Sequence, residues 1–253
     1  MPIFGRADVD ALLPTAPVIA GLRPAPWELP EAELLQATFE VVEDPALTLT
    51  PPALHPSIPP YAAFNVTRFP DTPVGPFTLA QVRLVCRAGI RPRGYLLGAV
   101  CDSPDAVAAL RSAWGYRVGL GEVVLSQRHD RVRGTVAVGG RTIMDLTMED
   151  GEPIGSSDLQ LVANLHLVRE SEEDRAGVLI QVDPEYAIHS AERGRPELAV
   201  YDGEAWGTGG GLDPHFPIVA FTCTADTDLP AMRFTLDPRR PAFEGTRRIE
   251  VAA

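Results

Sequence analysis

The strongest constraint on the fold is a series of segments in which apolar and polar residues alternate, separated by turn-forming residues. Residues 77–88 and 159–170 show the alternation most clearly, and residues 93–102 form a more continuously apolar run. A period of two is typical of β-strands with one buried face. Prolines are dense in residues 1–60 and disfavour helices there. We therefore expect a mainly β (α+β) chain with few short helices.

Local signals predict two helices and one tight turn. Ser103 occupies an N-cap position before Pro104, and Gly115 follows the last apolar residue at helical spacing. This pattern predicts a helix of about three turns. A second, short helix is predicted over residues 30–36, where acidic residues come early. Gly139-Gly140 predicts a tight turn between two strands.

Lysine is absent from the sequence, because all 22 basic residues of the 253-residue chain are arginines. A side-chain Schiff base needs a primary amine, whereas a guanidinium stays protonated. Only the α-amino terminus therefore offers such an amine. The formal net charge of -12 disfavours binding to nucleic acids and to anionic membranes.

Cysteine and histidine usage bears on the compartment and on metals. Cys86, Cys101 and Cys223 are odd in number and share no close spacing, so we interpret them as reduced thiols in a cytoplasmic protein. We find no signal-peptide pattern and no apolar run long enough for a membrane span. No two of the five histidines have metal-ligand spacing, so no metal site is predicted.

Residues 94–121, GYLLGAVCDSPDAVAALRSAWGYRVGLG, resemble the core motif of the acetoacetate decarboxylase family. In that motif a strand, an acidic turn and a short helix lead to an aromatic residue, Gly or Ala, and Tyr-Pro-Lys-Lys-Leu-Gly. Two weaker similarities lie at residues 204–206 and 228–230. The resemblance implies a single domain over residues 1–253, a β-barrel or β-cone enclosing a pocket. Residues 1–60 would pack on the barrel, and homo-oligomers are expected.

The chain departs from the family at the catalytic positions. The Schiff-base lysine of the family falls on Val118, its lysine neighbour on Gly119 and the preceding proline on Arg117. The two pocket glutamates of the family fall on or near Leu79 and near Asn65. Amine nucleophile, amine activator and acid are therefore missing, and carbinolamine formation at this site is excluded.

The resemblance nevertheless selects candidate site residues. The predicted substrate-binding residues are Val118, Leu79, Trp114, Asn65 and Glu204, and the catalytic candidates are Arg117, Tyr95, Tyr116 and His166. An arginine or tyrosine in the pocket would polarise a carbonyl or bind a carboxylate, and a histidine would act as acid or base. Each has a structural alternative: an exposed rim arginine, core tyrosines, a structural histidine and a turn glutamate.

Three functions follow. The first is a cofactor-independent enzyme of polyketide-type metabolism that folds an apolar oxygenated substrate for cyclisation, including cycloaddition, or isomerisation. The second is a lysine-independent decarboxylase or dehydratase of a β-keto or hydroxy acid, which requires an arginine inside the pocket. The third is a non-catalytic carrier of apolar ligands. A chamber around position 118 smaller than a few water molecules would exclude the first two.

Overall fold

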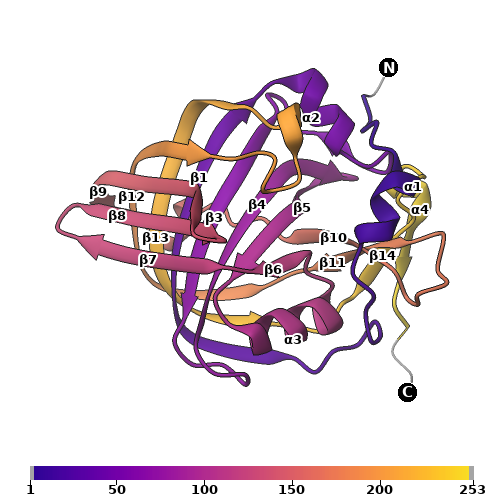
Figure 1. Ribbon diagram of the computed structural model, residues 1–253, viewed down its shortest axis with the longest axis horizontal. Helices are drawn as coiled ribbons and strands as arrows, with labels where there is room; N and C mark the ends of the chain where they lie inside the picture. Colours follow the sequence, from indigo (N-terminus) through magenta and orange to yellow (C-terminus); the bar gives the residue numbers. More distant parts are fainter. Residues whose placement is uncertain (1–2, 251–253) are drawn as a thin grey trace.

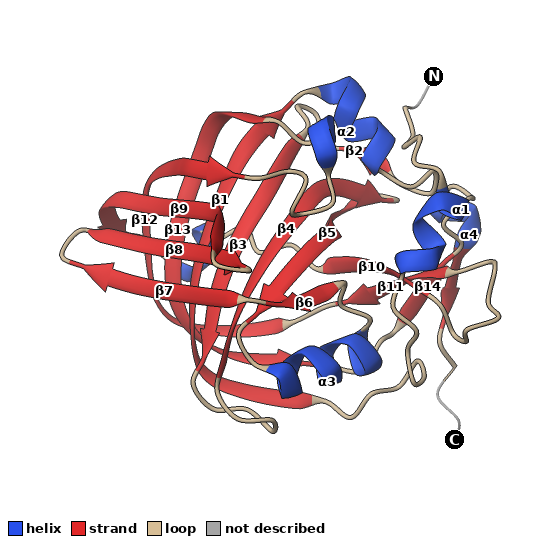
Figure 2. Ribbon diagram, viewed as in Figure 1, coloured by secondary structure: helices blue, strands red, loops and turns tan. Residues whose placement is uncertain are grey.

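The computed structural model describes residues 3–250, in which one 15-stranded sheet carries most of the chain (Figures 1 and 2). The strands are β1 (Trp27–Val41), β2 (His55–Pro56), β3 (Tyr61–Phe69), β4 (Phe77–Ala88), β5 (Arg91–Cys101), β6 (Val118–Leu120), β7 (Glu122–Arg128), β8 (Arg131–Val138), β9 (Arg141–Pro153), β10 (Asn164–Val168), β11 (Val178–Val182), β12 (Glu185–Tyr201), β13 (Pro214–Leu229), β14 (Phe234–Leu236) and β15 (Thr246–Arg248). The helices are α1 (Val9–Leu12), α2 (Glu43–Leu49), α3 (Pro104–Trp114) and α4 (Ala242–Gly245), with 3-10 turns η1 (Leu13–Thr15), η2 (Ser156–Asp158) and η3 (Gly209–Gly211). The mainly β prediction is confirmed.

The sheet is strongly curved but not closed. Its hydrogen-bonded path runs β15-β14-β11-β10-β5-β4-β3-β1-β13-β12-β9-β8-β7, with β2 added to β4 and β6 added to β5. The two end strands, β15 and β7, do not pair with each other within residues 3–250. The expected barrel is therefore an open, curled sheet. Most pairings are antiparallel, whereas β10 and β6 both run parallel to β5.

The helix predicted over residues 30–36 is wrong, because this segment lies inside β1. Strand β1 pairs with β13 on one side and with β3 on the other. Leu34 and Leu35 are both buried, on opposite faces of the strand. A bulge between Leu29 and Ala32 places Glu31 at φ 53°. Pro30 and Glu31 therefore lie outside the regular pairing with β13. Pairing on two sides thus outweighs the local helix signal.

Helix α3 and the following turn confirm the local prediction. The Ser103 hydroxyl accepts the Ala106 N–H at 3.4 Å, and Gly115 ends the helix at φ 62°. The predicted Gly139-Gly140 turn joins β8 to β9, with both glycines at positive φ. The strand predicted over residues 159–170 is confirmed only for β10, because residues 159–163 form an irregular loop.

Of the turn glycines Gly115 and Gly139, Gly115 is expected to lose more stability when it is replaced by alanine. A Cβ there would lie 2.1 Å from Val168 Cγ1, and the left-handed backbone adds strain. Gly115→Ala should lower the free energy of unfolding by about 2–4 kcal/mol. Gly139 has positive φ but open space around its Cβ position. Gly139→Ala should therefore lower the free energy of unfolding by only about 1 kcal/mol. If urea unfolding showed equal losses for the two variants, the clash with Val168 would be refuted.

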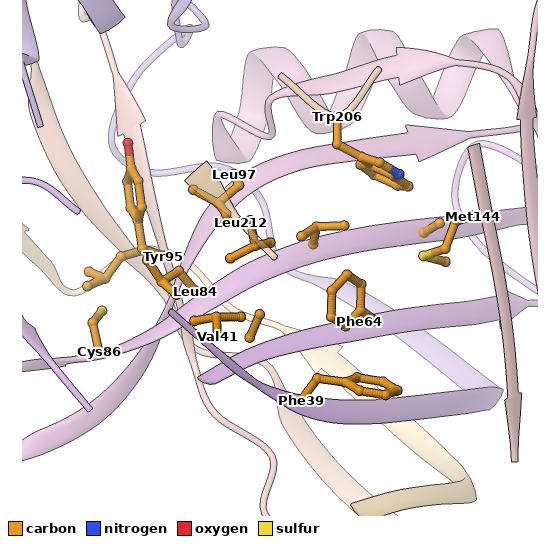
Figure 3. Packing of buried hydrophobic residues seen from close by; sticks show 14 of the residues in the cluster. Phe39, Val41, Phe64, Leu84, Cys86, Tyr95, Leu97, Met144, Trp206 and Leu212 are labelled. Atoms are coloured by element: carbon orange, nitrogen blue, oxygen red, sulfur yellow. The ribbon is translucent and has the colours of Figure 1, made fainter. Parts of the chain in front are cut away.

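The central strands are buried on both faces. In β4 the residues Ala80, Val82 and Leu84 belong to the larger apolar cluster. Figure 3 shows Leu84 in this cluster with Phe64 of β3. The alternate β4 residues face the other side of the sheet, where a second cluster forms around Leu79. The prediction of a half-buried strand over residues 77–88 therefore needs correction. This second face carries the candidate site.

Candidate functional site

A cavity of about 30 Å³ lies against this second face of the sheet. Its volume corresponds to about two or three water molecules. Half-buried Trp27, Pro184 and Tyr186 contribute to its rim. The apolar part of the wall consists of Leu29, Leu34, Phe69, Phe77, Leu79, Leu110 and Leu229. The polar lining consists of Asn65, Thr67, Gln81, Arg83, Tyr116, Asn164, Tyr186 and Thr227. We call this space the inner cavity.

Strand register brings the polar residues together. Gln36 of β1 pairs with Asn65 of β3, and Asn65 pairs with Gln81 of β4. Alternation then places Arg83 on the same face as Gln81. Asn164 opens β10, which runs beside β5. Side chains from four strands therefore form one polar cluster, which lies between two apolar regions.

Arg83 is the centre of this group. Its Nη1 donates to the Asn164 Oδ1 at 2.7 Å and to the Val162 carbonyl at 3.0 Å. Its Nη2 donates to the Gln36 Oε1 at 2.9 Å and to the Asn65 Oδ1 at 2.5 Å. The side chain is buried, and burial lowers the pKa of its guanidinium. The group nevertheless stays charged, because an arginine is not deprotonated in proteins.

No carboxylate among the described residues forms an ion pair with Arg83; all four of its hydrogen-bond acceptors are neutral. A buried cation without a counter-ion is costly, so the interior is electrostatically prepared for an anionic oxygen. Three buried atoms of cavity-lining residues also lack a partner within residues 3–250: Arg83 Nε, Gln81 Oε1 and Thr227 Oγ1. A bound ligand or water would satisfy such groups.

Tyr116 lines the inner cavity, and His166 packs against it from outside the cavity lining. Their rings meet edge to face with centroids 4.4 Å apart. The Nδ1 of His166 lies 2.7 Å from the Trp114 carbonyl, which only accepts, so Nδ1 carries the proton. Burial lowers the pKa of His166 to about 4, opposed by this hydrogen bond and assisted by the Arg83 charge. The ring is therefore neutral at pH 7, and its buried Nε2 has no partner among the described residues.

His166 should make stability depend on pH. Its pKa is about 4 in the folded chain and near 6.5 when unfolded. The unfolded state therefore binds more protons between these values, and stability falls as the pH drops from 6.5 towards 4. From pH 7 to pH 5 this residue should remove roughly 2 kcal/mol from the free energy of unfolding. In urea titrations, His166→Gln should show a pH dependence weaker by that amount; identical slopes would contradict the assignment.

A larger pocket of about 440 Å³ lies on the same sheet face, beyond Gln36. We call it the outer pocket. It is lined by Gln36, Thr38 and Glu40 of β1, Tyr61 and Ala63 of β3, Val85 of β4, Ile218, Val219 and Phe221 of β13, and Pro59, Ile154, Asp158, Gln160, Val162 and Arg193. The Gln36 Nε2 donates to the Gln160 carbonyl at 3.3 Å. Gln36 and the loop over residues 159–163 thus separate the outer pocket from the inner cavity.

The sequence-predicted binding residues divide into three groups. Asn65 and Leu79 line the inner cavity, as does the catalytic candidate Tyr116. Val118 and Trp114 are buried in the apolar cluster beside it but do not line it. Glu204 is exposed in a turn before Trp206, so its structural alternative describes its position.

Arg117 and Tyr95 lie together, but away from the inner cavity. Tyr95 pairs with Leu84 and packs into the larger apolar cluster on the opposite sheet face (Figure 3). Arg117 is half-buried and lines a hollow of about 10 Å³ with Tyr95 and His166. The expectation that Arg117 or Tyr95 enters the same chamber as Leu79 is therefore wrong. Strand β6 begins at Val118, and alternation turns its neighbour Arg117 the other way.

Sequence reasoning missed Arg83, Gln81 and Asn164. The available signal was the position of Gln81 and Arg83 at alternate sites of one strand. Polar residues at a period of two usually mark a solvent face. Here that face is interior, and only the register with β1, β3 and β10 shows it.

The comparisons with known proteins agree with this fold. The acetoacetate decarboxylase sequence profile matches residues 14–180, more than half of the chain. The chain belongs to the acetoacetate decarboxylase family. An acetoacetate decarboxylase from Legionella pneumophila subsp. pneumophila str. Philadelphia 1 superposes with a TM-score of 0.72 and 18% identity, covering 90% of this chain and 94% of that one.

Two further solved structures share the fold. The enduracididine biosynthesis enzyme MppR, complexed with pyruvate, has a TM-score of 0.68 and 18% identity over 86% of this chain and 97% of that chain. An acetoacetate decarboxylase-like enzyme from Sphingomonas wittichii RW1 has a TM-score of 0.65 and 14% identity, covering 92% and 95%. No curated protein matches the sequence. Family members are enzymes, which supports the enzymatic hypotheses.

None of the helices in residues 3–250 is both long enough and apolar enough to cross a bilayer. No group of three or more His, Cys, Asp or Glu side chains in this range is arranged to hold a metal ion. Cytoplasmic location, cofactor independence and homo-oligomerisation remain predictions.

Proposed function

We propose that the protein is a lysine-independent lyase that removes carbon dioxide from a β-keto acid by holding the keto oxygen against Arg83. The observation that carries this proposal is the buried Arg83 guanidinium, which no carboxylate among the described residues neutralises. Arg83 would serve as the interior arginine that the second hypothesis requires. The other supports are family membership and the apolar cavity wall.

The reaction needs no covalent intermediate. The bond between the α-carbon and the carboxylate breaks, and its electron pair forms a carbon–carbon double bond while the keto oxygen becomes an enolate oxygen. Carbon dioxide leaves, and the enolate carbon then takes a proton from water. Charge thus moves from the carboxylate to the keto oxygen. A fixed guanidinium beside that oxygen stabilises the transition state more than the substrate.

The apolar wall of the inner cavity also favours the loss of carbon dioxide. Leu79, Phe77 and Phe69 line the space beside Arg83 and offer a carboxylate no hydrogen bond. An anion there is poorly solvated, whereas neutral carbon dioxide is not penalised. Tyr116 holds its proton, since burial raises the pKa of its hydroxyl. It can therefore donate a hydrogen bond without becoming charged.

The cyclisation hypothesis receives less support from the site. The chamber expected around Val118 lies instead beside it, because Val118 does not line the inner cavity. That cavity of about 30 Å³ holds only about two or three water molecules and cannot enclose a folded polyketide. A space of that size suits a carboxyl-sized group instead.

The test is carbon dioxide release from 3-oxobutanoate and 3-oxooctanoate, measured against the spontaneous rate at pH 7. We expect release at least 100 times faster than the uncatalysed reaction, since enzymes rarely accelerate reactions by less than a million-fold. The matched control is the corresponding saturated acid, which has no keto oxygen to accept charge. Rates indistinguishable from the spontaneous reaction with both keto acids would refute the proposal.

A further inference from the structure

The outer pocket has the size of a ligand site and has no role in the chemistry described above. Its volume of about 440 Å³ falls within the range of small-molecule pockets. The apolar side chains Ala63, Val85, Ile218 and Phe221 form much of its lining. The inner cavity, by contrast, has room only for a carboxyl-sized group. Any substrate larger than that needs further space on the same sheet face.

Gln36 connects the two spaces. It lines the outer pocket, and its Oε1 accepts hydrogen bonds from Arg83 Nη2 and from Asn65 Nδ2, both at 2.9 Å. An oxygen with one guanidinium donor and one amide donor occupies the position that an anionic oxygen would prefer. The Gln36 amide is therefore a neutral occupant of an anion site. Its remaining contact, from Nε2 to the Gln160 carbonyl, is long at 3.3 Å.

The charges around the outer pocket fix an orientation. Strand register sets Thr38 level with Arg83 across Ala63, so Gln36 and Glu40 lie two positions to either side. The Arg83 guanidinium hydrogen-bonds Gln36 and forms no ion pair with Glu40 among the described residues. Asp158 is exposed, and the Arg193 Nη2 donates to its backbone carbonyl at 3.5 Å. The Arg83 charge is thus directed to the Gln36 side of the pocket. An acid would enter with its charged end towards Gln36 and its apolar body along Ala63.

We infer that the outer pocket binds the apolar body of a medium-chain or aryl-substituted acid, one oxygen of which displaces the Gln36 Oε1 from Arg83. In a simple acid this is a carboxylate oxygen, and in a β-keto acid it is the keto oxygen on which the negative charge develops. The inference rests on the proposed function in that Arg83 serves both. It adds the substrate class: an acid with an extended apolar body, larger than 3-oxobutanoate. Gln36 becomes the residue that keeps Arg83 hydrogen-bonded until the acid arrives.

The first experiment is calorimetric titration of the intact chain with octanoate and butyrate, acids that cannot lose carbon dioxide by this route. Octanoate has four more methylene groups to bury and should bind at least tenfold tighter than butyrate. Ile218 is 45% exposed and lines the pocket, so Ile218→Asp is expected to fold and to reduce that preference to less than threefold. Val124→Asp, at an exposed site on β7, is the matched control and should preserve it. Equal affinity for the two acids, or an unchanged preference in Ile218→Asp, would overturn the inference.

The second experiment tests displacement. Gln36→Ala removes the competing oxygen, so octanoate should bind at least threefold tighter. Gln127→Ala, at an exposed position of β7, should not change the affinity. Octanoate binding that is unchanged or weaker in a folded Gln36→Ala variant would also overturn the inference. These titrations do not depend on turnover. Chain-length-dependent binding without carbon dioxide release would support the inference and refute the proposed function. Carbon dioxide release with equal affinity for octanoate and butyrate would refute the inference and support the proposed function.

Discussion

Arg83→Met should reduce carbon dioxide release from 3-oxooctanoate by on the order of 100-fold, because a buried charged hydrogen-bond donor to an anion contributes about 3 kcal/mol. Methionine has a similar length and no charge, so it tests the guanidinium rather than the space. The effect should appear in kcat/KM, and most of it in kcat if Arg83 stabilises the enolate more than the bound acid.

Arg87→Met is the matched control for this change. Arg87 is exposed on the same strand, four residues further along β4. Its replacement should leave the rate within twofold of the original. Arg83→Met also removes a donor from three side-chain acceptors, so circular dichroism and the unfolding midpoint must show that the variant is folded. A folded Arg83→Met variant with full activity would remove Arg83 from the mechanism.

Asn164→Asp should separate stability from activity with an isosteric change. The Asn164 Oδ1 already accepts from Arg83 Nη1 at 2.7 Å, so the new carboxylate would meet the guanidinium without rearrangement. The pair neutralises the buried charge, and a hydrogen bond to a charged partner is stronger by roughly 1–2 kcal/mol. We expect a higher unfolding midpoint. Carbon dioxide release should fall by at least 50-fold, because Arg83 no longer attracts an anion.

The opposite signs of these two effects are the decisive feature of the Asn164→Asp variant. A variant that only damages packing loses both stability and activity. Asn164→Ala provides that comparison, since it leaves the Arg83 Nη1 with one acceptor fewer. If Asn164→Asp were more stable and fully active, the positive charge of the interior would have no part in catalysis.

Local signals in the sequence predict much of the fold but only part of the site. Helix α3 is predicted because Ser103, Pro104 and Gly115 act through contacts within a few residues. The segment over residues 30–36 is mispredicted because its conformation depends on β3 and β13, strands far away in the chain. Asn65 and Leu79 are found through the family resemblance, which carries positional information that periodicity lacks.

Arg83 escapes sequence analysis for a physical reason. A polar residue at alternate positions of a strand indicates water on that side only if the sheet has one buried face. In this curled sheet β4 is covered on both sides, and the environment of Arg83 is built by Gln36, Asn65 and Asn164 from three other strands. The choice between Arg117 and Arg83 as the interior cation depends on that tertiary arrangement.

The most direct test of the central claim follows the keto oxygen of the substrate. A Schiff base expels this oxygen as water, so the ketone product would acquire its oxygen from the solvent. A reaction that keeps the oxygen against Arg83 would retain it. We predict that 3-oxooctanoate turned over in ¹⁸O-labelled water gives 2-heptanone whose early product carries no label beyond spontaneous exchange, as measured by mass spectrometry. Complete incorporation of solvent oxygen during turnover would show that an amine performs the chemistry and would contradict this account.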